Sequence, residues 1–227
     1  MSAITPVRKD IAHPMHVKKH SAGLRLWHWM TAVVISGSII TVWINSLFTG
    51  GQEVATLSQE ALKKAGLNPS VQQVRAVPHA LGDRVWAVHE YFGYVLAALF
   101  LFRLVLEFFQ LTDQKFMRKM KLAYQAFQTR KKNRQLAIHE LTVKLIYTAF
   151  YILLLMMVLT GLSLAFDDAS TFLRSIRGPV KEVHGFGLYL VLLFIFVHLA
   201  GVFLAERKDG KGIVSDMING GDNDPIN

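Results

Sequence analysis

The residues of this chain best suited to redox or metal chemistry are its histidines, because the sequence holds nine of them and no cysteine. The lack of cysteine excludes disulfide bonds, cysteine-bound zinc, iron–sulfur clusters and thiol catalysis. Four histidines lie within or at the edges of long apolar stretches, where an ionisable side chain is a functional candidate: His28, His89, His184 and His198. His139 opens a further apolar stretch, and the others lie in polar segments where solvated side chains are expected: His13, His16, His20 and His79.

The spacing of the four candidates predicts two pairs. His184 and His198 lie fourteen residues apart, which is roughly 21 Å along a helix, and fourteen steps of 100° return both side chains to much the same side. His28 lies about one turn inside the first apolar stretch and His89 about one turn inside the second. Matching by depth in a membrane therefore pairs His28 with His198, and His89 with His184.

Two such pairs indicate haem, because two neutral imidazoles facing each other across a helical bundle form the axial ligand set of bis-histidine haem. Glycines near the histidines or on neighbouring stretches would leave room for a flat macrocycle; they are Gly37, Gly93, Gly161, Gly187 and Gly201. A hydrogen-bonded packing role is the alternative for any single histidine. A His-lined metal-ion transporter is a more remote alternative, since none of the apolar stretches has a central carboxylate.

The composition shows which elements must position these residues. Of the 227 residues, 52% are hydrophobic and only 18% are charged, which is too apolar and too poor in charge for a soluble domain. Apolar stretches of roughly 20 residues predict membrane-spanning helices. We therefore expect an all-α integral membrane four-helix bundle enclosing two haems. Its membrane domain covers residues 24–205, with spans at about 24–48, 86–109, 141–166 and 183–205.

The distribution of Lys and Arg, whose excess gives the chain a net charge of +9, predicts its orientation in the membrane. Lys and Arg concentrate before the first span, between the second and third, and after the fourth, so both termini, 1–23 and 206–227, should be cytoplasmic. The polar start argues against a cleaved signal peptide and favours a signal anchor. The basic amphipathic segment 111–135 is expected to lie on anionic lipid rather than nucleic acid. A helix-like stretch, Ser58–Ala65, lies in the long connection 49–85.

Several motifs resemble one protein family. Arg25-Leu26-Trp27-His28-Trp29 resembles the opening of the b-type cytochrome subunits of membrane-bound nickel–iron hydrogenases, whose broad family includes the bacterial cytochrome b561 proteins. Further matches are Val88 to Tyr94, Thr160-Gly161, Val183-His184 with Val197-His198, and the ending Asp216 to Gly221. The resemblance extends from about Leu24 to Gly221. It departs after His139, where Glu140-Leu141 stands in place of the Asn-Pro pair common in the hydrogenase subunits.

The resemblance implies two haem b groups in a four-helix bundle, with His28 and His198 as ligands of an inner haem and His89 and His184 of an outer one. It also implies electron flow from a periplasmic partner through both haems to quinone. We expect the membrane anchor of a periplasmic hydrogenase or other dehydrogenase or reductase complex, with the partner docking on residues 49–85 and 167–181. The alternative is a free-standing cytochrome b561-type oxidoreductase, alone or as a homodimer, that passes electrons from a small reductant such as superoxide to quinone.

Haem propionates are anionic and need cationic neighbours. The candidates at the inner haem are Arg25 and Arg103, and those at the outer haem are Arg174, Arg177 and Lys181, although each can equally be a surface charge that sets topology. A tentative quinone site at the mouth of the third span consists of His139 and Lys144.

Overall fold

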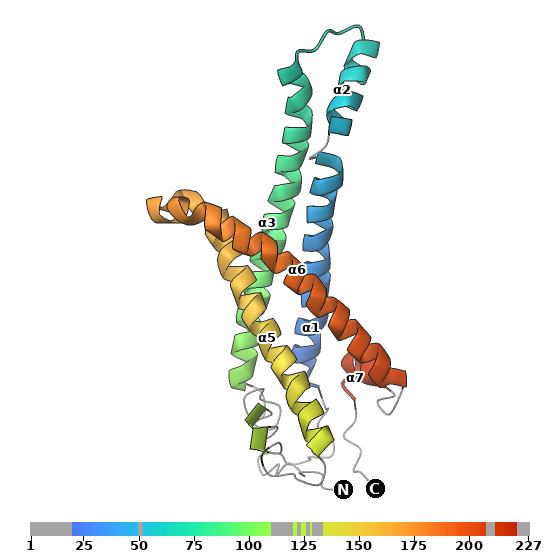
Figure 1. Ribbon diagram of the computed structural model, residues 1–227, viewed down its shortest axis with the longest axis vertical. Helices are drawn as coiled ribbons and strands as arrows, with labels where there is room; N and C mark the ends of the chain where they lie inside the picture. Colours follow the sequence, from blue (N-terminus) through green and yellow to red (C-terminus); the bar gives the residue numbers. More distant parts are fainter. Residues whose placement is uncertain are drawn as a thin grey trace. The chain divides into compact units, whose positions relative to one another are not determined.

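The structure is a computed structural model that describes residues 20–49, 52–109, 134–207 and 212–221, together with residues 120, 121, 124, 125 and 128. These residues form helices and contain no strand. Its long helices (Figure 1) are α1 (Ala22–Ile44), α3 (Val71–Phe109), α5 (Arg134–Ala165) and α6 (Thr171–Arg207). Shorter elements are a π-helical turn (Asn45–Thr49), α2 (Gln52–Lys64), a 3-10 turn (Asp167–Ala169) and α7 (Ile213–Asn219).

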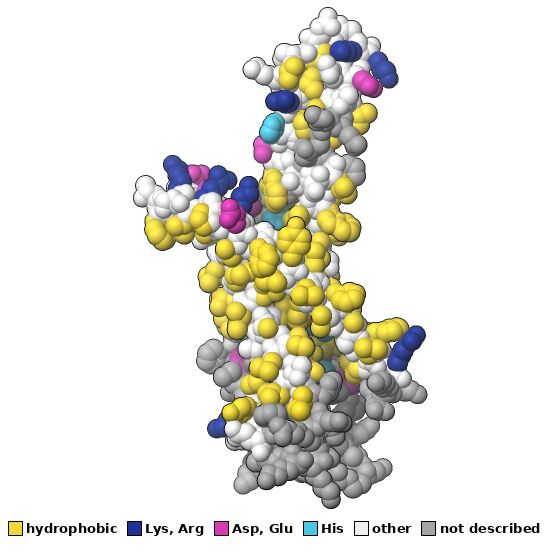
Figure 2. Space-filling model, viewed as in Figure 1, with side chains coloured by type: hydrophobic (Ala, Val, Ile, Leu, Met, Phe, Trp, Pro, Cys, Tyr) yellow, Lys and Arg dark blue, Asp and Glu magenta, His cyan; other side chains and the backbone are white. Residues whose placement is uncertain are grey.

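Each long helix is long and apolar enough to cross a membrane. The candidate spans are Ala22–Leu47, Val71–Glu107, Leu141–Ala165 and Thr171–Arg207. Large hydrophobic side chains such as Trp43, Leu101 and Ile152 are mostly exposed on these helices, as lipid-facing residues are. Figure 2 shows hydrophobic side chains over much of the helical surface and charged ones gathered near α2 and the start of α6. The prediction of an all-helical membrane protein with four spans is confirmed.

Serine caps explain where three of the long helices begin. The Ser21 hydroxyl accepts a hydrogen bond from the Leu24 N–H at 3.3 Å, and the Ser170 hydroxyl accepts one from the Leu173 N–H at 3.1 Å. At α3, Ser70 and Gln73 each accept a hydrogen bond from the other's N–H, at 3.3 and 2.8 Å, which is a capping box. These caps start α3 and α6 well before the expected spans at 86 and 183, so both helices include residues that the sequence indicated as connections.

The chain divides into two compact units, and each long helix contributes residues to both. Unit 1 comprises residues 1–29, 100–157 and 182–227, and unit 2 comprises residues 30–99 and 158–181. Unit 1 therefore contains His28, His184 and His198, and unit 2 contains His89.

In unit 1 the C-terminal helix α7 is bonded to the start of α1. Arg25 Nη1 donates a hydrogen bond to the Ile218 carbonyl, and Trp29 Nε1 donates one to the Met217 carbonyl at 3.1 Å. Gly220, with a φ of +104°, ends α7 in the left-handed conformation that glycine adopts without strain. These bonds satisfy carbonyls that a short helix leaves unpaired, and they fix the two side chains that lie three residues before and one residue after His28.

In unit 2 a close approach brings α1 against α3. A Cβ placed on Gly37 would lie 2.5 Å from Cζ of Phe92, so the Phe92 ring occupies the space that a side chain at position 37 would need. The expected helix in the long connection is confirmed as α2, which begins earlier than expected and ends before Gly66, with a φ of +79°. Unit 2 thus combines the middle of α1 with the helices that precede and contain His89.

Candidate functional site

The imidazoles of His28 on α1 and His198 on α6 face each other in unit 1. Their ring centroids lie 6.2 Å apart, with the ring planes inclined at 57°. Both side chains are half-buried. His28 Nδ1 is buried and has no hydrogen-bond partner among the described residues. The structure therefore brings together two histidines that are 170 residues apart in the sequence.

The separation of these rings fits an iron atom between them. Metal–imidazole bonds are about 2 Å long, so two imidazoles on one metal have ring centroids roughly 6 Å apart. Within the described residues, no group of three or more His, Asp or Glu side chains is arranged to hold a metal ion. A two-histidine set needs a cofactor that supplies the remaining ligands itself, and a porphyrin supplies four nitrogens. The donor set at His28 and His198 therefore fits haem better than a bare metal ion.

Aromatic rings surround the pair. Phe194 stacks on His198 at 5.7 Å between centroids and on Phe150 at 4.1 Å, and Trp29 meets His28 edge-on at 5.2 Å. Gly201 follows His198 by three residues, and nothing lies within 4 Å of a Cβ placed on it. The pair thus has fixed apolar walls and an open position beside one of its histidines.

A buried cation lies close to this pair. Arg103 is only 6% exposed; its Nε donates a hydrogen bond to the Tyr151 hydroxyl at 3.0 Å, and its Nη1 pairs with Glu107 at 3.1 Å. Its guanidinium also lies 5.8 Å from the centroid of Trp27, which stacks on Tyr151. Because Trp27 immediately precedes His28, the positive charge of Arg103 is held one side chain away from the histidine pair.

The other arginines predicted near haem propionates also have partners. Arg25 donates to the Ile218 carbonyl, but its Nε is buried without a hydrogen-bond partner among the described residues. In unit 2, Arg174 pairs with Asp168 at 2.5 Å and Arg177 with Asp167 at 2.7 Å. Lys181 is exposed. A propionate role for any of these cations, or for Arg103, stays a prediction.

His89 in unit 2 is held by α1. Its Nδ1 lies 2.9 Å from the Thr41 hydroxyl, 3.3 Å from the Ser38 hydroxyl and 3.3 Å from the Ser38 carbonyl. The Trp86 ring meets the imidazole edge-on at 5.3 Å. Ser38 and Thr41 were not predicted as partners of His89, because they lie 51 and 48 residues before it. The signal that could have indicated them is the presence of two hydroxyl side chains three residues apart on an otherwise apolar helix.

The predicted pairing of His89 with His184 stays a prediction, because these residues belong to different units. Among the predicted glycines, Gly93 resembles Gly201 in having nothing within 4 Å of an added Cβ. The space beside Gly187 is occupied by Met157 and Met156, as that beside Gly37 is by Phe92. Gly161 lies in the last part of α5. The role of these glycines in accommodating a macrocycle stays a prediction.

Of the remaining histidines, two have a position that the structure describes in full. His79 is exposed on α3, and the backbone N–H of His20 donates to the Gly220 carbonyl at 3.0 Å. His13 and His16 lie outside the described residues, as does most of the basic segment 111–135. Of the tentative quinone site, Lys144 is half-buried on α5, and His139 lies on the same helix with a side chain outside the described part.

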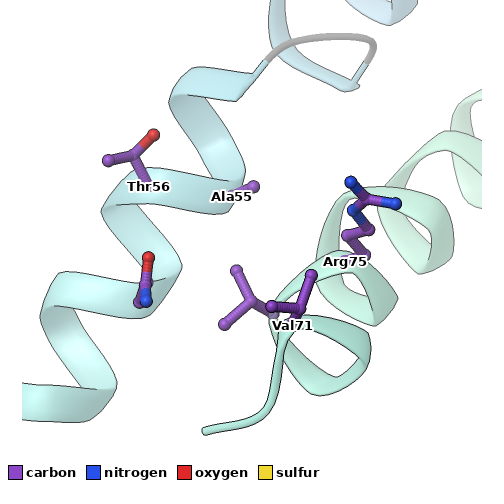
Figure 3. A pocket seen from close by; sticks show the side chains of 6 residues that line it. Ala55, Thr56, Val71 and Arg75 are labelled. Carbon is purple, nitrogen blue, oxygen red and sulfur yellow. The ribbon is translucent and has the colours of Figure 1, made fainter.

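A small pocket lies between α2 and α3 in unit 2 (Figure 3). It has a volume of about 220 Å³, and its lining combines apolar and polar side chains: Ala55, Thr56, Gln59, Val71, Val74 and Arg75. None of these residues is a histidine, so the pocket is not part of the ligand sites. It lies in the connection that the sequence predicts as a docking surface.

Comparison with known proteins gives one match. A protein family described as prokaryotic cytochrome b561 matches residues 19–220 of the chain. Neither curated proteins nor solved structures give a match. The matched range contains the four long helices and the histidines His28, His89, His184 and His198.

Proposed function

The chain belongs to the prokaryotic cytochrome b561 family, and on that premise we propose that it is a di-haem, quinone-reactive subunit that anchors a periplasmic hydrogenase or other dehydrogenase or reductase in the membrane. The family has a four-helix membrane bundle. As a member, the chain is a multi-pass protein of the bacterial inner membrane that binds b-type haem and takes part in electron transfer. The number of haems, the quinone and the partner are the proposed part.

The observation that carries the proposal is the His28–His198 pair, whose ring separation of 6.2 Å suits a bis-histidine iron. Bound haem supplies a one-electron redox centre at that position. His28 and His198 would ligate the inner haem, and Phe194, Trp29 and the Trp27–Tyr151 stack would keep water from it. The Arg103 guanidinium would favour the reduced state there, because a nearby positive charge stabilises an added electron, but its ion pair with Glu107 at 3.1 Å offsets part of that effect.

His89 and His184 are the proposed ligands of the outer haem. His184 and His198 share α6 at a spacing of roughly 21 Å, so one helix would carry a ligand of each haem. Since the chain has no cysteine, it has no cysteine-ligated cluster to collect electrons from a periplasmic donor. We therefore place a partner subunit at the segment that contains α2 and the start of α3. The quinone would bind near His139 and Lys144.

Purification in mild detergent tests the anchor role. We expect a periplasmic redox subunit to co-purify, and we expect a soluble quinone analogue to reoxidise the reduced preparation. The double variant His139→Ala/Lys144→Met should slow that reoxidation, whereas Lys121→Met, a matched change at an exposed lysine, should not. A chain that runs as a lone monomer or homodimer would favour the free-standing oxidoreductase, and failure of quinone to reoxidise the preparation would contradict the quinone-reactive role.

A further inference from the structure

The hydrogen bonds around His89 determine which of its nitrogens carries the proton. The Thr41 hydroxyl, which is buried, lies 2.6 Å from the Ser38 carbonyl and donates its single proton to it. Towards His89 Nδ1, at 2.9 Å, the same hydroxyl can then only accept. The Ser38 carbonyl, 3.3 Å from Nδ1, is also an acceptor only. The Ser38 hydroxyl, also 3.3 Å from Nδ1, can either donate or accept, so it is compatible with a proton there. The two acceptor-only contacts therefore place the proton of a neutral His89 on Nδ1 and leave the lone pair on Nε2.

From this network we infer that the Ser38–Thr41 turn of α1 is a positioning element for the outer haem ligand. It holds His89 as the Nδ1–H tautomer, so that Nε2 is the nitrogen presented to iron. The inference rests on the proposed function, in which His89 is a ligand. Hydrogen bonds of this kind orient metal-bound histidines and increase their basicity, and their loss typically weakens metal binding 10–100-fold. Thr41 and Ser38 do not touch the metal themselves; they act through His89.

Packing between α1 and α3 keeps the turn within reach of the imidazole. Gly37 directly precedes Ser38, and Phe92 lies three residues after His89 on the same side of α3. The Phe92 ring fills the space beside Gly37, so the two helix backbones approach closely at this level. On its other side the imidazole meets the edge of Trp86 at 5.3 Å. The ring of His89 is thus confined by hydrogen bonds and by packing together.

His28 of the inner pair and His89 differ in the hydrogen bonding of Nδ1. His28 Nδ1 is buried with no hydrogen-bond partner among the described residues, whereas His89 Nδ1 has a hydroxyl at 2.9 Å. A hydrogen bond from Nδ1–H makes the imidazole a stronger donor and stabilises the ferric state more than the ferrous state. The turn should therefore lower the potential of the haem at His89, which is the direction expected for the site that receives electrons first.

The test is an optical redox titration of the full-length haem-loaded protein with Thr41→Val, which keeps the side-chain shape and removes the hydroxyl. If the variant stabilises the ferric state relative to the ferrous state ten times less, the reduction potential of the haem rises by about 59 mV for a one-electron couple. We expect such a rise in one haem only, the one that His89→Ala removes. Thr41→Ser keeps the hydroxyl and should retain the wild-type potential. Thr148→Val is the matched control, because the Thr148 hydroxyl also donates to a backbone carbonyl, that of Lys144, and forms no hydrogen bond with a histidine among the described residues.

Selective loss of the same haem in Thr41→Val, with retention in Thr41→Ser, would equally support the inference. Unchanged potentials in a fully loaded Thr41→Val protein would overturn it. So would an equal defect in Thr41→Ser and Thr41→Val, since the position would then matter for shape alone. A wild-type protein that holds no haem dependent on His89 is a different result, because it contradicts the proposed function before Thr41 is considered.

Discussion

At the scale of single residues, the two imidazoles of unit 1 have different surroundings. His198 is stacked on Phe194 with a plane angle of 9°, which fixes its ring from one side. His28 lies between Trp27 and Trp29, which are held by Tyr151 and by the Met217 carbonyl. The neighbours of each ring lie on its own helix and are held in turn by residues of other helices: Phe150 and Tyr151 on α5, and Met217 on α7. Such preorganisation is what a ligand site requires if the cofactor is to bind in one geometry.

Replacement of His198 by alanine should remove the inner haem and leave the outer one. The haem content of the purified protein should fall by half, and the remaining haem should keep its low-spin spectrum, because the proposed outer ligands, His89 and His184, are unchanged. His79→Ala is the matched control, since His79 is an exposed histidine on α3. Haem content measured as a pyridine complex, set against protein concentration, checks the prediction.

A second variant separates ligation from folding. In His198→Gly, free imidazole added during growth can occupy the vacated position and should restore the missing haem. Full haem content in His198→Ala would remove His198 from the ligand set. Loss of all haem that imidazole does not restore would assign His198 a structural role instead.

At the scale of helices, the elements themselves follow from sequence patterns, but their contacts do not. The apolar stretches predict the four spans, and depth matching predicts that α1 and α6 bring His28 to His198. The prediction began this span at 86 and missed the capping box of Ser70 and Gln73, which explains why α3 begins at Val71. The partners of His89 were not readable, since a contact across 48 residues depends on the rotation of two helices about their axes.

The contact between α1 and α3 depends on the absence of a side chain at position 37. Gly37→Ala should destabilise the protein by about 1–3 kcal/mol, the usual cost of overpacking, because its Cβ would lie 2.5 Å from Phe92 Cζ. Gly178→Ala is the control: nothing lies within 4 Å of a Cβ there, and alanine is the better helix former. Thermal unfolding in detergent measures the difference. Equal melting temperatures for the two variants would show that Phe92 can move without cost.

A smaller side chain at position 92 should relieve the clash that an alanine at position 37 would cause. The double variant Gly37→Ala/Phe92→Leu should recover part of the lost stability, because leucine leaves space that the phenylalanine ring occupies. The two positions are in contact, so their effects should be strongly non-additive. Additive losses would mean that the helices are held apart by other residues.

At the scale of the whole molecule, composition explains the environment and the histidines explain the function. A chain with 52% hydrophobic and 18% charged residues needs lipid around its helices. The absence of cysteine leaves haem as the redox cofactor that its side chains are suited to ligate. Membership of the prokaryotic cytochrome b561 family agrees with both statements. The partner and the quinone could not be read from the sequence in the same way, because docking surfaces and quinone sites lack a fixed ligand chemistry.

The measurement that tests the central claim most directly is the haem content and visible spectrum of the purified wild-type chain. Two bis-histidine sites predict two haem b groups per polypeptide, both low-spin, with bands that sharpen on reduction. The ring separation of 6.2 Å at His28 and His198 suits one of them, and the proposed pairing of His89 with His184 would supply the site of the other. A ratio of one haem per chain, or a high-spin spectrum that indicates an open axial position, would contradict the two-site account.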